Sequence, residues 1–117
     1  FRRITVVDMV LHLKDICQKE GIEAEVVDLR WLRPLDLEPV FESFKKTNRC
    51  VVVEESLPHF SFGSEIAAQL QEAAFDYMDA PIQRVSAMDV PLPYAAEIEL
   101  MALPNAQKVV DAVKKVL

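Results

Sequence analysis

Glycine is almost absent from this chain: only Gly21 and Gly63 occur among its 117 residues. Two glycines so far apart cannot form the G-x-G-x-x-G or Walker-type loops that hold nucleotide phosphates. Backbone N–H groups bind a diphosphate only where no side chain blocks their close approach. The sequence therefore predicts that this chain alone has no site for a nucleotide or another diphosphate cofactor.

Metal-ligating residues are equally sparse. His12 and His59 lie far apart in the sequence, and Cys17 and Cys50 lack Cys-x-x-Cys spacing, so no metal site is predicted. His12 falls in a helical pattern and is expected to be structural. We expect the cysteines to be buried free thiols of a reducing, intracellular compartment. No secretory signal is visible, and the abrupt start on a strand-like run suggests a piece of a longer protein.

Long apolar runs and a positive net charge are also missing. Hydrophobic residues make up 51% of the chain, but no run approaches the roughly 18 residues of a membrane span. A net charge of −6 argues against a nucleic-acid partner, because phosphate binding needs clustered lysine and arginine. An acidic surface suits a basic protein partner, although a solvated acidic face is the commoner explanation. The acidic residues in question follow one helical stripe: Glu65, Glu72, Asp76 and Asp79.

The apolar pattern predicts strands over 4–7, 24–29, 50–53 and 82–85. Apolar positions at helical spacing occupy 9–17, 37–46, 66–77 and 109–117, with Gly21 and Asn105 as expected caps. Between 89 and 103, Pro91 and Pro93 predict a long loop without a regular helix. Strands separated by helices need crossover connections, so the fold class is a three-layer α/β domain with a mostly parallel sheet.

An arginine-rich loop joins the second strand to a helix that Asp36 is placed to cap. Arg30 and Arg33 lie where the strand has ended and the helix has not begun. In an open α/β sheet this rim is the usual place for contacts. The alternative is that both arginines only pair with carboxylates of their own domain.

A second rim loop follows the third strand and contains Glu54, Glu55 and His59. Two carboxylates and an imidazole could perform acid–base chemistry. The alternative is that the glutamates point to opposite sides and serve local hydrogen bonding, since consecutive strand residues alternate faces. Ser61 and Ser64 form no G-x-S-x-G elbow, and Ser64 is expected to help cap the following helix.

Several runs, in this order, resemble the C-terminal domain of pyruvate dehydrogenase beta subunits, within the transketolase C-terminal-domain family. These runs are Asp28-Leu-Arg-Trp-Leu-Arg-Pro-Leu-Asp36, Ser43-Phe-Lys-Lys-Thr-Asn-Arg49, Val51-Val-Val-Glu-Glu55, Phe62-Gly-Ser-Glu-Ile-Ala-Ala68, Ala80-Pro-Ile-Gln-Arg-Val85 and Asp89-Val-Pro-Leu-Pro-Tyr-Ala95. The resemblance implies one domain over 1–117 with a mainly parallel five-stranded sheet and helices on both faces. It also implies a bacterial cytoplasmic or organellar matrix location.

The resemblance further implies a parent α2β2 enzyme that decarboxylates pyruvate and acylates a lipoyl group with thiamine diphosphate and magnesium. In such enzymes the cofactor-binding residues lie outside this domain, so it is expected to be inactive alone, with no catalytic, cofactor-binding or metal-binding residue. It would contact the alpha subunit and a second beta subunit, with Arg30, Arg33, His59 and Phe60 as candidate interface residues. In some relatives it would also receive the basic binding domain of the dihydrolipoyl acyltransferase core, here through Glu72, Asp76 and Asp79.

One departure from the family pattern follows the first strand, where Val7 runs directly into Asp8 without the usual glycine-containing loop. Alternative interpretations stay open at this point. The domain could come from a branched-chain 2-oxo acid or acetoin dehydrogenase. It could be a stand-alone receiver-like or flavodoxin-like binding module, or a self-contained hydrolase-like or isomerase enzyme that uses Glu54, Glu55 and His59.

Overall fold

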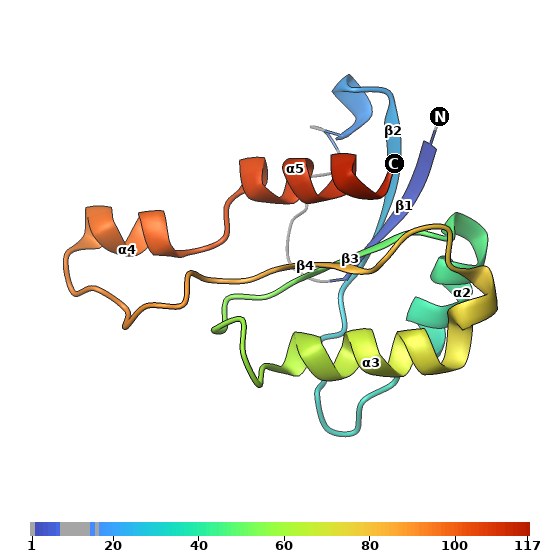
Figure 1. The fold of residues 1–117 in the computed structure, drawn as a ribbon, viewed down its shortest axis with the longest axis horizontal. Helices are drawn as coiled ribbons and strands as arrows, with labels where there is room; N and C mark the ends of the chain where they lie inside the picture. Colours follow the sequence, from blue (N-terminus) through green and yellow to red (C-terminus); the bar gives the residue numbers. More distant parts are fainter. Residues whose placement is uncertain (1, 8–14, 16) are drawn as a thin grey trace.

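A computed structural model describes residues 2–7, 15 and 17–117, which include a four-stranded parallel sheet (Figure 1). The strands are β1 Arg2–Val7, β2 Ile22–Val27, β3 Cys50–Val53 and β4 Gln83–Val85, in the spatial order β2-β1-β3-β4. Every neighbouring pair is parallel. The expected helix over 9–17, with His12, falls largely outside the described residues, as does Asp8.

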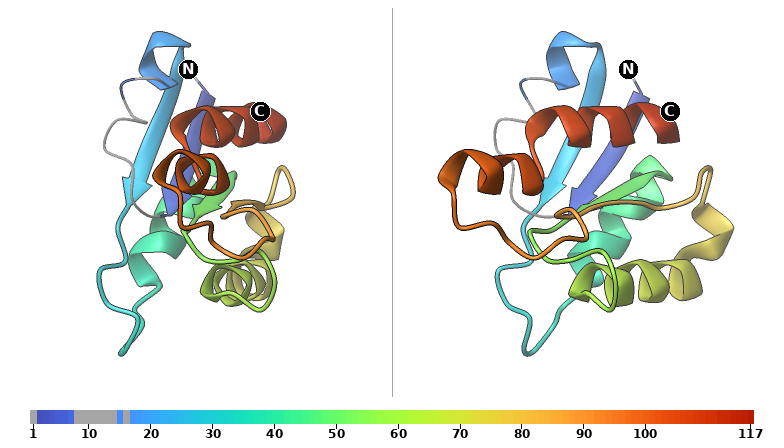
Figure 2. Two further views of the ribbon diagram at one scale, coloured as in Figure 1. Left: turned by 90° about the vertical axis from the view of Figure 1, so that its left-hand side faces the viewer. Right: turned by 60° about the vertical axis from the view of Figure 1, so that its left-hand side comes forward.

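Helices cover both faces of the sheet, which confirms the three-layer α/β class (Figures 1 and 2). One face carries α2 Glu38–Thr47 and α3 Phe62–Ala74, the latter continued by the 3₁₀ turn η1 Phe75–Tyr77. The other face carries α5 Ala106–Val116. The resemblance implies five strands, and the described part of the chain forms four of them.

The β3 strand divides the apolar core into two clusters because its side chains alternate between the faces. Val51 and Val53 pack with α5, whereas Cys50 and Val52 pack with α2 and α3. All four side chains are buried, as expected for a central parallel strand covered on both sides. Within the described residues, no helix is long and apolar enough to cross a membrane.

Local signals explain where the helices begin and end. Asn105 caps α5 as predicted, with Oδ1 accepting a hydrogen bond from the Lys108 N–H at 2.9 Å. Asp36 lies one residue before the N-cap of α2 and accepts from the Glu38 N–H at 3.0 Å. Gly21 takes the left-handed conformation expected of a C-cap, with φ +74°.

The prediction of a helix-free segment between 89 and 103 is wrong. A short helix, α4 Ala96–Ala102, forms in it. Pro91 and Pro93 exclude a helix only up to their own positions, and the alanine, glutamate, leucine and methionine residues that follow are good helix formers.

Candidate functional site

The carboxyl ends of the strands meet at one edge of the sheet. Val7 is in register with Val27 and with Val52, and Val53 is in register with Val85. The segments 28–36, 54–61 and 86–95 therefore leave from the same rim, where open α/β folds usually make their contacts. The predicted interface residues Arg30, Arg33, His59 and Phe60 all belong to these segments.

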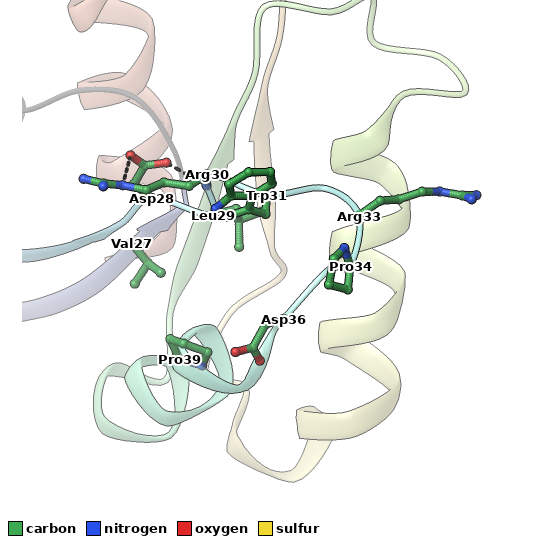
Figure 3. A pocket seen from close by; sticks show the side chains of 9 residues that line it. All are labelled: Val27, Asp28, Leu29, Arg30, Trp31, Arg33, Pro34, Asp36 and Pro39. Atoms are coloured by element: carbon green, nitrogen blue, oxygen red, sulfur yellow. Dashed lines mark hydrogen bonds and ion pairs between the residues drawn. The ribbon is translucent and has the colours of Figure 1, made fainter.

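The loop 28–36 folds back on itself through an antiparallel bridge between Leu32 and Leu35. Arg30, at φ +54°, is tied to Asp28 by an ion pair of 3.3 Å between Nε and Oδ2 and by an N–H bond of 3.0 Å to Oδ1. Arg30 thus pairs within its own domain, as the alternative interpretation held. Arg33 is exposed, points away from the loop (Figure 3), and forms no ion pair within the described part of the chain.

Two hollows flank this loop. One of about 610 Å³ lies between the loop and the start of α2, with Trp31, Pro34 and Pro39 in its wall (Figure 3). The Trp31 side chain is 72% exposed although it lines this hollow. The other, of about 570 Å³, lies between the loop and the start of α3 and is lined by Glu54 and Glu55 among others.

Glu54 is the most fully bonded side chain at the rim. Its Oε1 accepts from Ser61 Oγ at 2.5 Å, and its Oε2 accepts from the Gly63 N–H at 2.9 Å. Arg84 lies beside this group and donates from Nη1 to Pro58 O at 3.0 Å and to Ser64 Oγ. Together Glu54 and Arg84 fasten the loop 56–61 to the ends of β3 and β4.

Burial of the Glu54 carboxyl by itself raises its pKa, because the charged form loses water. Hydrogen bonds from Ser61, Ser56 and the Gly63 amide, together with the charge of Arg84, outweigh that effect. The pKa of Glu54 therefore lies below its ordinary value, and the carboxylate is ionised. This bonding also corrects the expectation for Ser64, whose hydroxyl meets Ser61 and Arg84 while Ser61 occupies the N-cap position of α3.

The proposed acid–base group of Glu54, Glu55 and His59 is not assembled. Glu54 is engaged with the loop, Glu55 is exposed, and His59 reaches a different carboxylate, with 3.3 Å between its Nε2 and Asp89 Oδ2. The Ala87 N–H also donates to Ser56 O at 3.0 Å. His59 therefore helps to join the loop 56–61 to the segment 86–95. Phe60, at φ +54°, stands fully exposed between these contacts.

The predicted acidic stripe is only partly continuous. Glu72 lies on α3, but the α-helix ends at Ala74 and Asp76 belongs to the 3₁₀ turn. Asp79 lies 3.6 Å from Arg49 in an ion pair with that residue. All four residues of the stripe are exposed, but Glu65 accepts a hydrogen bond from Gln69 and Asp79 pairs with Arg49. Within the described part of the chain, Glu72 and Asp76 are the two members whose carboxylates are not engaged in such a contact.

The rim residues that the structure describes do not fit a diphosphate group. The space in which a side chain at Gly63 would lie is filled by the Glu54 carboxylate, so the Gly63 amide already holds an anion. A diphosphate there would meet a like charge.

Within the described ranges, no three His, Cys, Asp or Glu side chains are placed to hold a metal ion together. Sequence reasoning missed Ser61, Gly63 and Arg84 as partners of Glu54, because no spacing rule predicts how the loop after β3 folds back, and Arg84 reaches Glu54 only through the crossover from β3 to β4.

The sequence matches the family "Transketolase, C-terminal domain" over residues 5–109. It is 54% identical to "Pyruvate dehydrogenase E1 component subunit beta" of Rhizobium meliloti over 85% of this chain and 22% of that protein. It is 50% identical to the mitochondrial protein with the same description from Saccharomyces cerevisiae, over 95% of this chain and 31% of that protein. The chain thus spans less than a third of the length of either relative.

A solved structure described as "Split gene transketolase, inactive beta4 tetramer" has the same fold. It aligns with a TM-score of 0.77 and 29% identity over 98% of this chain and 37% of that one. The family match covers most of the chain, and the parallel sheet with helices on both faces agrees with it. This chain therefore belongs to the transketolase C-terminal domain family.

Proposed function

We propose that this chain is the assembly domain of the beta subunit of a thiamine-diphosphate-dependent pyruvate dehydrogenase. Identities of 54% and 50% to beta subunits of that enzyme support this choice over the branched-chain or acetoin enzymes. The chain is then one domain, 1–117, of a longer subunit. With bacterial and mitochondrial relatives, its location would be the cytoplasm of a bacterium or the mitochondrial matrix.

The observation that carries the proposal is the apolar character of the rim. Large apolar side chains are exposed on all three rim segments, where an isolated soluble domain would present polar groups. They are Trp31, Leu32, Leu57, Phe60, Met88, Val90, Leu92 and Tyr94. Such a surface suits burial against protein, and the described rim segments offer no cradle for a diphosphate. Thiamine diphosphate and magnesium would be held by the rest of the enzyme, where they supply the decarboxylation chemistry.

We assign the interface residues different roles within this proposal. Arg33 and Phe60 extend from the rim toward an alpha subunit or a second beta subunit. Arg30 and His59 bind carboxylates of their own domain, Asp28 and Asp89, and so fix the loops that present the other two. The Arg30–Asp28 ion pair and the His59–Asp89 contact support this division.

A test compares assembly of the complete enzyme with and without the apolar contact. Phe60→Glu places a charge in the proposed interface and should reduce co-purification of the alpha subunit and pyruvate decarboxylation together. Phe75→Glu, an equally drastic change on the exposed face of η1, is the matched control. The proposal fails if Phe60→Glu assembles like the control, or if this chain alone turns over pyruvate or binds thiamine diphosphate in a calorimeter.

Docking of the acyltransferase core is a second contact within the same proposal. The exposed carboxylates of Glu72 and Asp76, with Asp79 beyond them, would attract a basic binding domain. Reversing all three to lysine in the complete enzyme should weaken binding of that domain at low salt. Each of the three single reversals is compared with Glu25→Lys, exposed on β2, which changes the net charge by the same amount. Unchanged affinity of the triple variant would remove these residues from the contact.

A further inference from the structure

The strand β4 leaves one edge of the sheet open. It lies at the end of the order β2-β1-β3-β4 and pairs with β3 alone among the described residues. Val85 O accepts a hydrogen bond from the Glu54 N–H at 2.9 Å, so the backbone groups of Val85 point toward β3. Successive residues of a strand point these groups to opposite sides, which turns the N–H and C=O of Arg84 and Ser86 toward the open edge. An unpaired edge is a template for a further extended chain.

A hollow of about 370 Å³ lies between this edge and α5. It follows the chain from Gln83 to Met88, and on its other side it is lined by four α5 residues. These residues are Lys108, Asp111, Ala112 and Lys115. Their spacing of three or four residues places them on one side of the helix. In Figure 1, β4 crosses between α5 and α3, so a chain added at the edge would lie between the same two helix layers.

Two lysines give the hollow a positive charge. Lys108 and Lys115 form no ion pair within the described part of the chain. Lys108 Nζ donates to the carbonyl oxygens of Met101 at 3.4 Å and Leu103 at 3.2 Å, which carry no full charge to balance the ammonium. Lys115 is exposed, two turns farther along α5. An acidic ligand in the hollow would therefore meet two ammonium groups.

The acidic side chain in the lining does not cancel this charge. Asp111 accepts a hydrogen bond from Gln107 at 2.9 Å, and its carboxylate also acts on the neighbouring Lys114. Arg84 lines the hollow too, but its guanidinium is engaged beside Glu54 at the rim and adds no charge to the hollow. The two lysines thus outweigh the single carboxylate, and the hollow favours negatively charged groups.

The dimensions of the hollow suit an extended chain. Lys108 and Lys115 are seven positions apart on α5, which is about 10 Å along the helix axis. Side chains on one face of a strand recur roughly every 7 Å, because each residue rises about 3.3 Å. Two carboxylates on one face of an added strand can therefore each meet one lysine.

The charge of the hollow also selects against a second copy of this chain at the same edge. Two β4 edges paired about a two-fold axis would bring the lysines of both α5 helices together, and like charges repel. The backbone edge itself offers hydrogen bonds to any extended segment. The lysines therefore decide which segment binds, and they favour an acidic one.

We propose that the hollow beside β4 binds an extended, acidic segment of a partner protein, which adds a strand to the open edge. The backbone of that segment pairs with Arg84 and Ser86, and its carboxylates meet Lys108 and Lys115. The contact uses none of the residues assigned above to subunit assembly or to acyltransferase docking. It goes beyond the proposed function and does not depend on it.

A labelled peptide tests the docking on the full-length protein. The peptide has six residues, alternates glutamate with valine and is blocked at both ends. Fluorescence anisotropy should show saturable binding, and hydrogen exchange at the Arg84 and Ser86 amides should slow when the peptide is added. A peptide with lysine in place of each glutamate should bind at least about tenfold more weakly.

Methylated peptides test the strand pairing without a change in charge or in the protein. One peptide is N-methylated at its valines and the other at its glutamates. Only one of these two sets of N–H groups can face β4, because alternate groups of a strand point to opposite sides. One methylated peptide should therefore bind at least about tenfold more weakly than the parent, and the other should bind as the parent does.

A charge reversal on the protein tests the lysines. Lys115→Glu should weaken binding of the glutamate peptide at least about tenfold and strengthen binding of the lysine peptide. Lys46→Glu, exposed on α2, changes the net charge by the same amount and should leave both affinities as in the wild type. Circular dichroism of both variants checks that the fold is retained.

Five results would overturn the proposal. Three concern the peptides: no saturable binding at millimolar concentration, equal binding of the glutamate and lysine peptides, or full affinity of both methylated peptides. The fourth is a Lys115→Glu variant that binds like Lys46→Glu. The fifth is exchange at Arg84 and Ser86 that the peptide does not slow, either because it binds elsewhere or because a second copy already protects these amides.

Discussion

The amide nitrogen of Gly63 lies 2.9 Å from Glu54 Oε2, so the carboxylate of a strand end binds the first turn of the following helix. Helix N-termini attract anions because their first N–H groups have no partner within the helix. Here the anion is a side chain of the protein itself. One of the chain's two glycines thus lets the Glu54 carboxylate, rather than a ligand phosphate, approach the backbone closely.

Gly63→Ala should destabilise the fold by about 2 kcal/mol. The new Cβ would overlap the Glu54 carboxylate, which must then leave its bonds with Ser61 and the Gly63 amide. This loss exceeds the roughly 0.5–1 kcal/mol that alanine gains over glycine in a helix. Urea unfolding of the two proteins measures the difference.

A double variant separates this clash from a general effect of alanine. With Glu54→Ala in place, Gly63→Ala meets no carboxylate and should cost little further free energy of unfolding. Equal costs of Gly63→Ala in both backgrounds would show that Glu54 and Gly63 are not coupled.

Acid should destabilise the protein partly through Glu54. Its folded pKa lies below the unfolded value of about 4.3, so its contribution to stability is complete above that pH. The contribution is lost as the pH falls through the depressed folded pKa. Glu54→Gln should therefore show a shallower decline in free energy of unfolding below about pH 4.3. Glu55→Gln, at the exposed neighbouring position, is the control for loss of one charge, and a decline in Glu54→Gln as steep as in the wild type would contradict the assignment.

Arg84→Ala should loosen the loop 56–61 and the first turn of α3. The guanidinium donates to Pro58 O and Ser64 Oγ and lies beside the charge of Glu54, so its loss frees all three groups. We expect a loss of about 1 kcal/mol in stability and faster hydrogen exchange at the Gly63 and Ser64 amides. Arg84→Lys keeps the charge without the forked geometry of the guanidinium. Its stability and exchange rates should lie between those of the wild type and of Arg84→Ala. Exchange rates that do not change in Arg84→Ala would contradict this role.

Cys50 should resist thiol reagents while the protein is folded. Burial raises the pKa of its thiol to about 12, and Cys17 is buried as well, with its pKa raised by burial and by the charge of Glu20. Reaction at pH 8 should therefore require unfolding, with Ala68→Cys as the exposed control. Because only the unfolded thiol ionises from about pH 8.5, stability is full below that pH and falls as the pH rises toward 12. Native-state labelling of Cys50 at the rate of Ala68→Cys would contradict its burial.

The local sequence pattern was sufficient to predict a strand or a helix end wherever its signal lies within a few residues. The continuous run Cys50–Val53 predicts a buried central strand, and Asn105 predicts the start of α5, because burial on both faces and capping are encoded at fixed short spacings. The rim arginines show the limit. Their position beyond β2 followed from the sequence. Only the tertiary structure separates Arg30, which pairs with Asp28, from Arg33, which has no ion pair among the residues described.

Composition and periodicity by themselves determined the layered parallel fold and the small number of positions where glycine lets a ligand approach the backbone. Both features depend only on which residues occur and on how they are spaced along the chain. Contacts made by the folding of the rim loops were decided only by the tertiary structure. Glu54 and Gly63 meet because a loop of eight residues brings a strand end against a helix start, and His59 meets Asp89 because two rim loops leave neighbouring strands. The same holds for the exposed apolar side chains of α4. The sequence of a helix does not predict whether its apolar side chains pack against another part of the same chain.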